Sequence, residues 1–392
     1  MLRSLFSGIS GLRSHQTMLD VTGNNIANVN TAGFKSSQVQ FQDTLSQMLM
    51  GAGGAQAGVG GTNPAQVGLG VRVAGITTNF TQGASQLTGR STDMMIQGDG
   101  FFVVRKGAET FYTRAGSFDF DSTGQMVLPG EGALVQGWMA VNGVIDTNSP
   151  LTDLRVPSGS VMAAVQSTAA TYAGNLDSAA ADGTVLNRTV DLYDSTGNAR
   201  TLTLTFTKSA TGWSLAASDG AATVAATPMT FATDGSLTTP TSLTIGGVAV
   251  DLTGITGFAG LDTAKAITQD GQAAGTLQSF ALGADGTITG SFSNGLKQVI
   301  GRIALGGFTN PAGLEKAGGS LFRTSVNSGD AAIGTAGTGG RGSLAGGALE
   351  MSNVDLSSEF TSLIVAQRGF QANSRVITTS DEVLQELVNL KR

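Results

Sequence analysis

Residue types that commonly carry out chemistry are scarce in this sequence. It contains no cysteine and a single histidine, His15, which excludes thiol catalysis, disulfides and metal sites built from paired histidines. Segment 119–124 has the spacing that opens a calcium loop, but the glutamate required at the twelfth position is replaced by Gly130. The Gly-Asp-Gly segment 98–100 lacks the lysine and hydroxyl residue of a phosphate loop. Hairpin turns are the favoured interpretation of both segments, and no catalytic, cofactor-binding or metal-binding residue is predicted.

The overall composition also excludes several classes of protein. Charged residues make up 13% of the 392 residues, against roughly 25% in ordinary domains, and glycine occurs 57 times. A net charge of −6 without a basic stripe does not suit nucleic-acid binding. No apolar run approaches the roughly 20 residues needed to span a bilayer, and the N-terminus lacks the pattern of a secretory signal. The composition is typical of turn-rich β-structure, and no nucleic-acid or membrane partner is predicted.

The two ends of the chain carry patterns of apolar residues that predict long helices. These residues recur at steps of three, four and seven, which is the pattern of a coiled-coil seam. The predicted subunit-packing positions are Leu5, Ile9, Leu12, Leu19 and Ile26 near the N-terminus, and Leu356, Phe360, Leu363, Phe370, Ile377, Leu384 and Val388 near the C-terminus. Ordinary core helices show the same pattern and are the alternative interpretation. Two seams at opposite ends of one chain favour helices that pair with each other or with those of neighbouring subunits.

Between these ends, short runs of alternating apolar residues separated by glycine turns predict β-structure. For example, residues 243–245 are expected to pair with residues 248–250 across a Gly-Gly turn. The predicted fold is mainly β with α-helical coiled-coil termini, arranged as nested, discontinuous domains. The expected parts are a terminal helical domain (1–30 and 353–392), Gly-rich connectors (31–70 and 329–352), an inner β domain (71–146 and 286–328) and an outer β-sandwich or barrel insertion (147–285).

Several stretches near both ends resemble the flagellar axial protein family of bacteria, which includes rod and hook proteins. These stretches are residues 19–28, 31–35, 349–356 and 367–374, and the family motif is carried by Asn24, Asn25, Asn28, Gly33 and Phe34. Residues 97–104 and 112–118, together with the long β insertion, are similar to the hook members of the family. Distal rod proteins share the ends but lack a sizeable outer domain, and they are the alternative.

This resemblance implies a structural role rather than an enzymatic one. It implies a hook subunit that assembles with many copies of itself into a curved helical tube, which transmits torque from rod to filament and encloses the export channel. The implied partners are the distal rod protein, the hook cap, the hook–filament junction protein and the flagellar type III export apparatus. The implied location is the cell exterior, reached without a cleavable signal. An enzyme would need an acid/base pair or a nucleophile arrangement, which the sequence does not offer, and a secreted adhesin would explain the β-rich middle but not two terminal seams.

A tube around an export channel is expected to have a polar lining, because apolar walls would retain unfolded passengers. The polar face expected for the C-terminal helix holds the candidate channel-lining residues, which are Arg368, Gln371, Arg375, Glu382 and Glu386. The resemblance, more than the pattern of residues, favours the C-terminal helix over the N-terminal one for this position.

Overall fold

The computed structural model of the chain describes residues 2–54, 57–58, 60–156 and 159–389. Residues 1 and 390–392 of the predicted terminal domain, 55–56 and 59 of the first predicted connector, and 157–158 of the predicted insertion lie outside the described residues. The chain divides into two compact units. The first comprises Met1–Val156, Ala281–Thr289 and Val299–Arg392, and the second comprises Pro157–Phe280 and Gly290–Gln298.

The first unit contains both helices and a large share of the strands. Its elements are α1 (Leu2–Ala27), β1 (Ser37–Asp43), β2 (Ser46–Met50), β3 (Ala65–Gly68), β4 (Val71–Thr78), β5 (Ser85–Leu87), β6 (Met94–Gln97), β7 (Phe101–Lys106), β8 (Glu109–Thr113), β9 (Asp119–Phe120), β10 (Met126–Leu128), β11 (Ala133–Met139), β12 (Thr152–Asp153), β27 (Leu305–Gly307), the 3-10 helix η1 (Pro311–Gly313), β28 (Glu315–Gly318), β29 (Leu321–Arg323), β30 (Ala332–Gly334), β31 (Ser343–Gly346), β32 (Ala348–Glu350) and α2 (Leu356–Asn389).

The second unit is built from strands. They are β13 (Val161–Met162), β14 (Ala169–Asn175), β15 (Val185–Tyr193), β16 (Ala199–Ser209), β17 (Gly212–Ser218), β18 (Thr223–Pro228), β19 (Thr230–Phe231), β20 (Leu237–Thr239), β21 (Ser242–Ile245), β22 (Val248–Thr256) and β23 (Lys265–Gln269). Three further strands, β24 (Gly275–Leu282), β25 (Thr287–Phe292) and β26 (Lys297–Ile303), have residues in both units.

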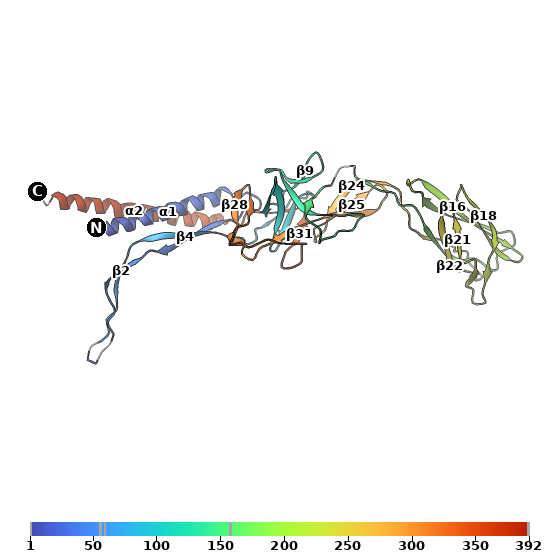
Figure 1. Cartoon of the computed structure of the whole chain (residues 1–392), viewed down its shortest axis with the longest axis horizontal. Coiled ribbons are helices and arrows are strands. Elements are labelled where there is room, and N and C mark those ends of the chain that lie inside the picture. The colour runs from blue at the N-terminus through green and yellow to red at the C-terminus, as the bar shows by residue number, and fades with distance from the viewer. Residues whose placement is uncertain (1, 55–56, 59, 157–158, 390–392) are drawn as a thin grey trace. The chain divides into compact units, whose positions relative to one another are not determined.

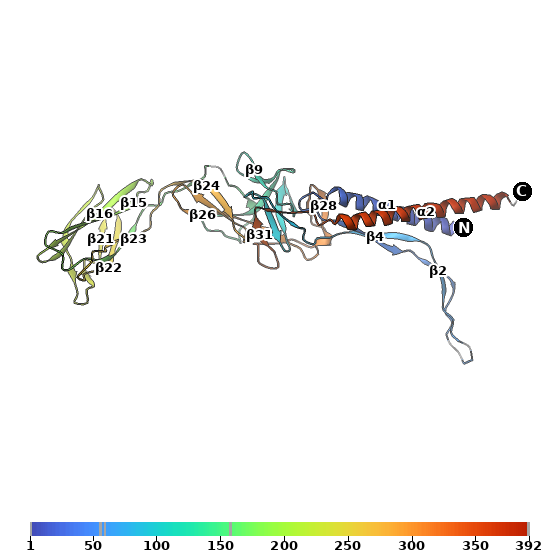
Figure 2. The same ribbon diagram turned by 180° about the vertical axis from the view of Figure 1, so that it is seen from behind.

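The two terminal segments form long helices that lie side by side (Figures 1 and 2). α1 ends where the sequence changes to asparagine and glycine, and Gly33 follows with a left-handed φ of 69°. α2 begins at an N-cap, because Asp355 Oδ1 accepts a 2.9 Å hydrogen bond from the backbone N–H of Ser357. Paired terminal helices were predicted and are confirmed. Among the described residues, no helix is long and apolar enough to cross a membrane.

The main sheet of the first unit joins strands from distant parts of the chain. Its order is β26-β11-β7-β8-β29-β28, and its aromatic core contains Phe101, Tyr112, Trp138 and Phe322. The prediction of a hairpin turn at residues 98–100 is wrong, because β6 pairs with β31 instead of β7. β7 is fully buried along its first four residues and lies between β8 and β11, so it offers no edge to β6. Residues 119–128 do form the predicted hairpin, from β9 and β10.

The predicted Gly-rich connectors are more regular than the sequence indicated. In the first predicted connector, 31–70, β2 pairs with β3, and β1 pairs with β4, which lies just beyond the connector. Within residues 329–352, β30, β31 and β32 pair with β27, β6 and β5. Small side chains do not prevent this pairing, because strand hydrogen bonds are made by backbone groups.

The second unit is a sandwich of two four-stranded sheets, in the orders β15-β16-β17-β18 and β21-β22-β14-β23. The two sheets share one core, to which Leu204 and Phe206 contribute from β16 and Tyr172 from β14. Ile245 pairs with Val248 across the predicted Gly-Gly turn, whose glycines have φ values of 55° and 85°. The predicted β-sandwich is therefore present, and the chain is mainly β with paired terminal helices.

Tyr172 is expected to limit the stability of this sandwich. Its side chain is fully buried, its hydroxyl has no hydrogen-bond partner among the described residues, and burial raises its pKa far above the usual value. Because an unsatisfied buried hydroxyl costs roughly 1–3 kcal/mol, Tyr172→Phe should stabilise the second unit by about 1 kcal/mol or more. Urea unfolding followed by the fluorescence of buried Trp213 measures this, and Tyr193→Phe at a half-buried position is the control. Equal effects of both substitutions would contradict the prediction.

Candidate assembly site

The two helices approach each other through glycine and other small residues. A Cβ at Gly11 would lie 2.6 Å from the side chain of Asn373, and a Cβ at Gly369 would lie 2.5 Å from the ring of His15. A Cβ at Gly8 would contact Ile377 at 3.4 Å. Real Cβ atoms do not come within 3.0 Å of a neighbour, so Gly11 and Gly369 leave the room that the side chains of Asn373 and His15 occupy between the helices.

The predicted seam of α1 does not lie at this contact. The fully buried positions of α1 are Gly8, Gly11, Ser14, Thr22 and Asn25. At 100° per residue, the centre of the predicted seam lies roughly 100° around the helix from these positions. Its members, Leu5, Ile9, Leu12, Leu19 and Ile26, are all half-buried. The seam therefore keeps apolar surface that is not covered within one chain, and its role in subunit packing remains a prediction.

The predicted seam of α2 is divided between two environments. Leu363, Phe370, Ile377 and Leu384 are half-buried on the side that carries the buried Ala366, whereas Leu356, Phe360 and Val388 are exposed. The predicted channel-lining residues Arg368, Gln371, Arg375, Glu382 and Glu386 are all exposed. Helical spacing places them within a sector of roughly 60°, about 170° from the side that packs on α1. The structure thus gathers these polar side chains on one exposed face.

A second apolar stripe on α2 was missed by the sequence analysis. Its members are Val365, Ala372, Val376, Val383 and Leu387, which are exposed and separated by steps of seven, four, seven and four. The same spacing rule that predicted the first seam applies to this one. It was overlooked because the larger leucine and phenylalanine residues dominated the pattern.

A buried group of charges lies where both helices join the β-structure of the first unit. Lys35 Nζ lies 2.7 Å from Glu350 Oε1, and both side chains are 0% exposed. Arg114 Nη1 lies 3.5 Å from the other oxygen of Glu350 and donates to Gly98 O at 2.9 Å. Burial lowers the pKa of Lys35 and of Arg114, and the Glu350 carboxylate opposes both shifts. One carboxylate therefore holds two cations in a site that water does not reach.

Backbone contacts reinforce the same junction. The N–H of Gly33 donates to Glu350 O at 2.7 Å, and the N–H of Gly83 donates to Glu350 Oε1 at 2.9 Å. Gly33 is required here, because its φ is positive and a Cβ would lie 2.5 Å from the backbone nitrogen of Ala115. Of the predicted motif residues, Gly33 thus has a clear physical role.

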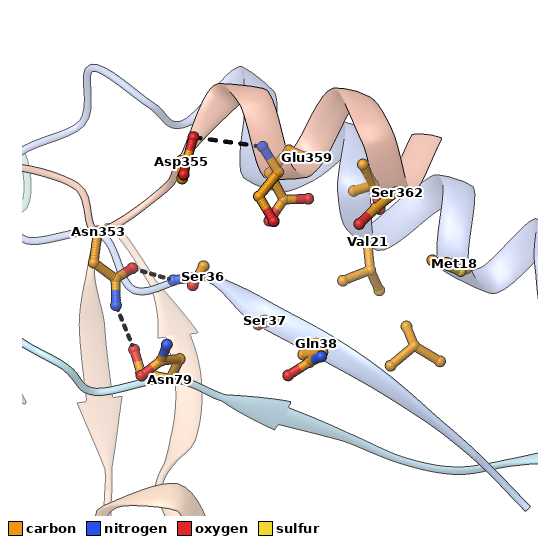
Figure 3. Close-up of a pocket in the computed structure, with 13 residues that line it drawn as sticks. Met18, Val21, Ser36, Ser37, Gln38, Asn79, Asn353, Asp355, Glu359 and Ser362 are labelled. Atoms are coloured by element: carbon orange, nitrogen blue, oxygen red, sulfur yellow. Dashed lines mark hydrogen bonds between the residues drawn. The ribbon is translucent and has the colours of Figure 1, made fainter. Parts of the chain in front are cut away.

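Asparagine side chains link the helices to the first strand. Asn25 donates to Ser37 O at 2.8 Å and to Glu359 Oε1 at 2.9 Å, so it bridges α1, β1 and α2. Asn353 accepts a 2.8 Å hydrogen bond from the N–H of Ser36 and donates to Asn79 O at 2.8 Å (Figure 3). These bonds cross-link segments that are far apart in sequence.

Asn79 and Asn353 lie in the wall of a cavity of about 320 Å³ between α1, β1 and the start of α2 (Figure 3). Met18 and Val21 line it from α1, and Glu359 and Ser362 line it from α2. Burial raises the pKa of Glu359, and the nearby Asp355 adds to the shift. Both polar and apolar side chains line the cavity, as expected at a junction between a helix pair and a sheet.

The remaining motif residues act locally. Asn28 donates to Asn24 O at 2.9 Å and accepts from the Thr31 hydroxyl at 3.1 Å, so both asparagines finish α1. The ring of Phe34 lies under the ammonium of Lys316 at 5.1 Å. Among the described residues, no group of three His, Cys, Asp or Glu side chains forms a metal site.

Comparison with known proteins places these features in one family. Residues 95–176 match the model of the flagellar hook protein FlgE/F/G D1 domain, residues 5–35 match that of the flagella basal body rod protein, and residues 345–390 match that of the flagellar basal body rod FlgEFG protein C-terminal region. The chain is 41% identical to flagellar hook protein FlgE of Treponema pallidum and 42% identical to FlgE of Borreliella burgdorferi, with 100% of each chain covered. The chain belongs to the flagellar FlgE/F/G family.

Other members of the FlgE/F/G family are also similar to it. The chain is 36% identical to the flagellar basal-body rod protein FlgG of Bacillus subtilis over 100% of both chains. The crystal structure of Helicobacter pylori flagellar hook protein FlgE2 has a TM-score of 0.50 and 16% identity, and the match covers 66% of this chain and 98% of that one. This likeness supports the fold. Lys35, Arg114 and Glu350 fall in three different FlgE/F/G family regions, so the buried charges join all three.

Proposed function

We propose that this chain is the structural subunit of the flagellar hook and assembles with many copies of itself into a curved helical tube. This proposal rests on the sequence identity of the chain to two flagellar hook proteins, which is 41% and 42% over full length. A distal rod role is the second candidate, because the identity to a rod protein is 36%. Hook proteins are thus favoured over rod proteins as relatives. The proposed role is structural, without enzymatic activity.

Uncovered apolar surface on both helices supports assembly of this kind. The half-buried seam of α1 and the exposed stripe of α2 provide two coiled-coil surfaces beyond the pairing within one chain. We propose that they pack on the terminal helices of neighbouring copies. Burial of each leucine or phenylalanine in such a contact contributes roughly 1.5–3 kcal/mol.

The two-stranded arm formed by β2 and β3 offers another surface for a second copy. Leu45, Met48, Leu49 and Met50 are exposed on or beside it, Leu45 to 81%. Four large apolar side chains on a short ribbon are a hydrophobic surface that association would cover. We include this arm in the proposed contacts between copies.

The proposed lumen lining is the polar face of α2. Along it, Arg368 and Arg375 are followed by Glu382 and Glu386, so the face carries both signs of charge, which suits a surface that passing chains must not bind. The further partners in the proposal are the distal rod protein, the hook cap, the hook–filament junction protein and the type III export apparatus. Location in the bacterial flagellum follows from the family, and export to the cell exterior without a cleavable signal is part of the proposal.

Electron micrographs of a strain that lacks this chain test the proposed function. Completed rods without hooks are expected, and hooks should return when the chain is supplied. Rods that stop short would favour the distal rod role, and normal flagella would contradict both. A helical reconstruction of the restored tubes should place α2 innermost, with its polar face toward the channel. Any other innermost element would overturn the lumen assignment alone.

A further inference from the structure

A cavity of about 460 Å³ in the first unit lies away from the helices' junction with β1. It is bounded by the turn 98–101, by residues 307–311 and by the glycine turn 339–341. Phe80, Phe101 and Phe308 supply aromatic walls, with ring centroids 5.4–5.5 Å apart in neighbouring pairs. Thr309 and Ala332 lie exposed at its rim. The cavity is therefore open to a partner and lined by rings and charges.

Arg341 is held rigidly in the wall of this cavity. Its Nε donates to Thr335 O at 3.1 Å, Nη1 donates to Ala332 O at 3.3 Å, and Nη2 donates to the Thr338 hydroxyl at 3.1 Å. A Cβ at Gly334 would overlap the guanidinium, so the backbone there leaves room for it. All three acceptors are neutral, and among the described residues no carboxylate lies within ion-pair distance of Arg341.

Arg341 keeps two donors for an acceptor from outside the described part of the chain. A guanidinium carries five N–H groups. Three of them are used, which leaves one on each terminal nitrogen without an acceptor among the described residues. Paired N–H groups on the two terminal nitrogens are the fork to which carboxylates bind with two hydrogen bonds. The guanidinium is therefore positioned for an anion that the chain itself does not supply.

A second arginine, Arg114, lies buried beneath the cavity. Arg114 lines the cavity, is 2% exposed, and its Nε has no partner in the described part of the chain. Its guanidinium lies over the ring of Phe101 at 5.2 Å. The cations here are Lys35, Arg114 and Arg341. The anions are Glu350, Asp99 at the rim, and Asp330, whose charge acts on Tyr112 beside Phe308; Arg341 is the cation of this group that has no ion-pair partner among the described residues.

We propose that this cavity binds a carboxylate side chain, Asp or Glu, of a second copy of the chain. The occupant follows from charge, because the chain has 28 acidic and 22 basic residues and assembles with itself in the proposed function, on which this inference rests. The carboxylate would take the two remaining N–H groups of Arg341. The aromatic walls would cover the aliphatic part of the inserted segment. These hydrogen bonds would fix how the β-structure of one copy is aligned with that of its neighbour.

Substitution at the rim tests the proposal without disturbing the hydrogen bonds that hold Arg341. Thr309→Glu places a carboxylate of the same chain beside the cavity, where it should occupy Arg341 and repel the incoming one. Thr309→Gln has nearly the same shape without the charge and is the matched control. We expect Thr309→Glu to lower the number of hooks per cell about tenfold, and Thr309→Gln to leave it unchanged. Equal hook numbers for the two variants would overturn the proposal.

Cross-linking identifies the occupant directly, because the natural chain has no cysteine. Thr309→Cys, labelled with a benzophenone maleimide, is irradiated in hooks assembled from ¹⁴N and ¹⁵N copies, and the joined peptides are identified by mass spectrometry. Peptides from a different copy that contain Asp or Glu are expected. Cross-links confined to the same copy, to acid-free segments or to a different protein would overturn the proposal. Absence of tubes from the unmodified chain would instead contradict the proposed function.

Discussion

Replacing Glu350 by glutamine should destabilise the first unit by about 3–5 kcal/mol, which is the usual result of removing one partner of a buried ion pair. The carboxylate is the anion shared by Lys35, at 2.7 Å, and Arg114, at 3.5 Å. Glutamine can still accept a hydrogen bond, but it leaves two buried cations without a counter-charge. Their repulsion and lost hydration both oppose folding. Because Glu350 lies just before α2 and Lys35 just after α1, the helix pair should also lose its attachment.

Urea unfolding followed by tryptophan fluorescence measures this effect. The chain has two tryptophans, and Trp138 belongs to the first unit, so a Trp213→Phe background reports that unit alone. Glu315→Gln is the matched control, because its ion pair with Arg323 is exposed to 51% and 60% and should contribute no more than about 1 kcal/mol. Similar losses for the two glutamine variants would show that the buried site is not a major source of stability.

The same experiment can compare Glu350→Gln with a substitution that removes one of the buried cations. Lys35→Met removes one of the two cations and leaves Glu350 paired with Arg114. Its loss of stability should therefore be smaller than that of Glu350→Gln, although both substitutions remove the ion pair between Lys35 and Glu350. The opposite order would mean that the contact, rather than the excess charge, determines the stability of the site.

Replacing Gly11 by leucine should separate the two terminal helices. Even a Cβ at this position would lie 2.6 Å from the side chain of Asn373, and a leucine adds three more carbons toward α2. Overpacking of this kind usually costs about 1–3 kcal/mol. Gly23→Leu, in the same helix, is the matched control, because its Cβ would have no atom within 4 Å. It should be neutral or stabilising, since leucine favours helix over glycine by about 1 kcal/mol.

A disulfide reports the pairing of the helices directly. The hydroxyl oxygens of Ser4 and Ser380 lie 3.4 Å apart, so Ser4→Cys with Ser380→Cys should form a bond on mild oxidation in the otherwise cysteine-free chain. The bond should fail to form when Gly11→Leu is added, and hooks should be lost as well. Gly23→Leu should leave the disulfide unchanged. An unaffected disulfide with Gly11→Leu would show that the helices do not depend on close contact at Gly11.

Short stretches of sequence were enough to predict both helices, one hairpin and the family of this protein. Apolar spacing predicted both helices, and Gly246-Gly247 predicted the hairpin between β21 and β22, because helical periodicity and left-handed turns depend on neighbouring residues. The resemblance at both ends indicated the family. Each of these features is a property of a short stretch of chain.

Only the tertiary structure decided which surfaces meet. The turn at residues 98–100 read locally as a hairpin, but β7 is central in its sheet and β6 pairs elsewhere. The leucine seam of α1 was expected at a helix contact, yet the contact within the chain is made by Gly8 and Gly11. A glycine carries no apolar signal in sequence, and its value as a close-packing position depends on what lies opposite.

The buried charges show most clearly the difference between what sequence predicts and what only the tertiary structure decides. Lys35 and Glu350 are 315 residues apart, and although both lie in stretches that resemble the family, no local sequence rule pairs them with each other. The fold brings them to 2.7 Å and removes water from both, which makes their interaction strong. Sequence determined the helices and turns because their energies are local. Tertiary structure alone decided the charge site and the helix contact, because burial and long-range proximity exist only in the folded chain.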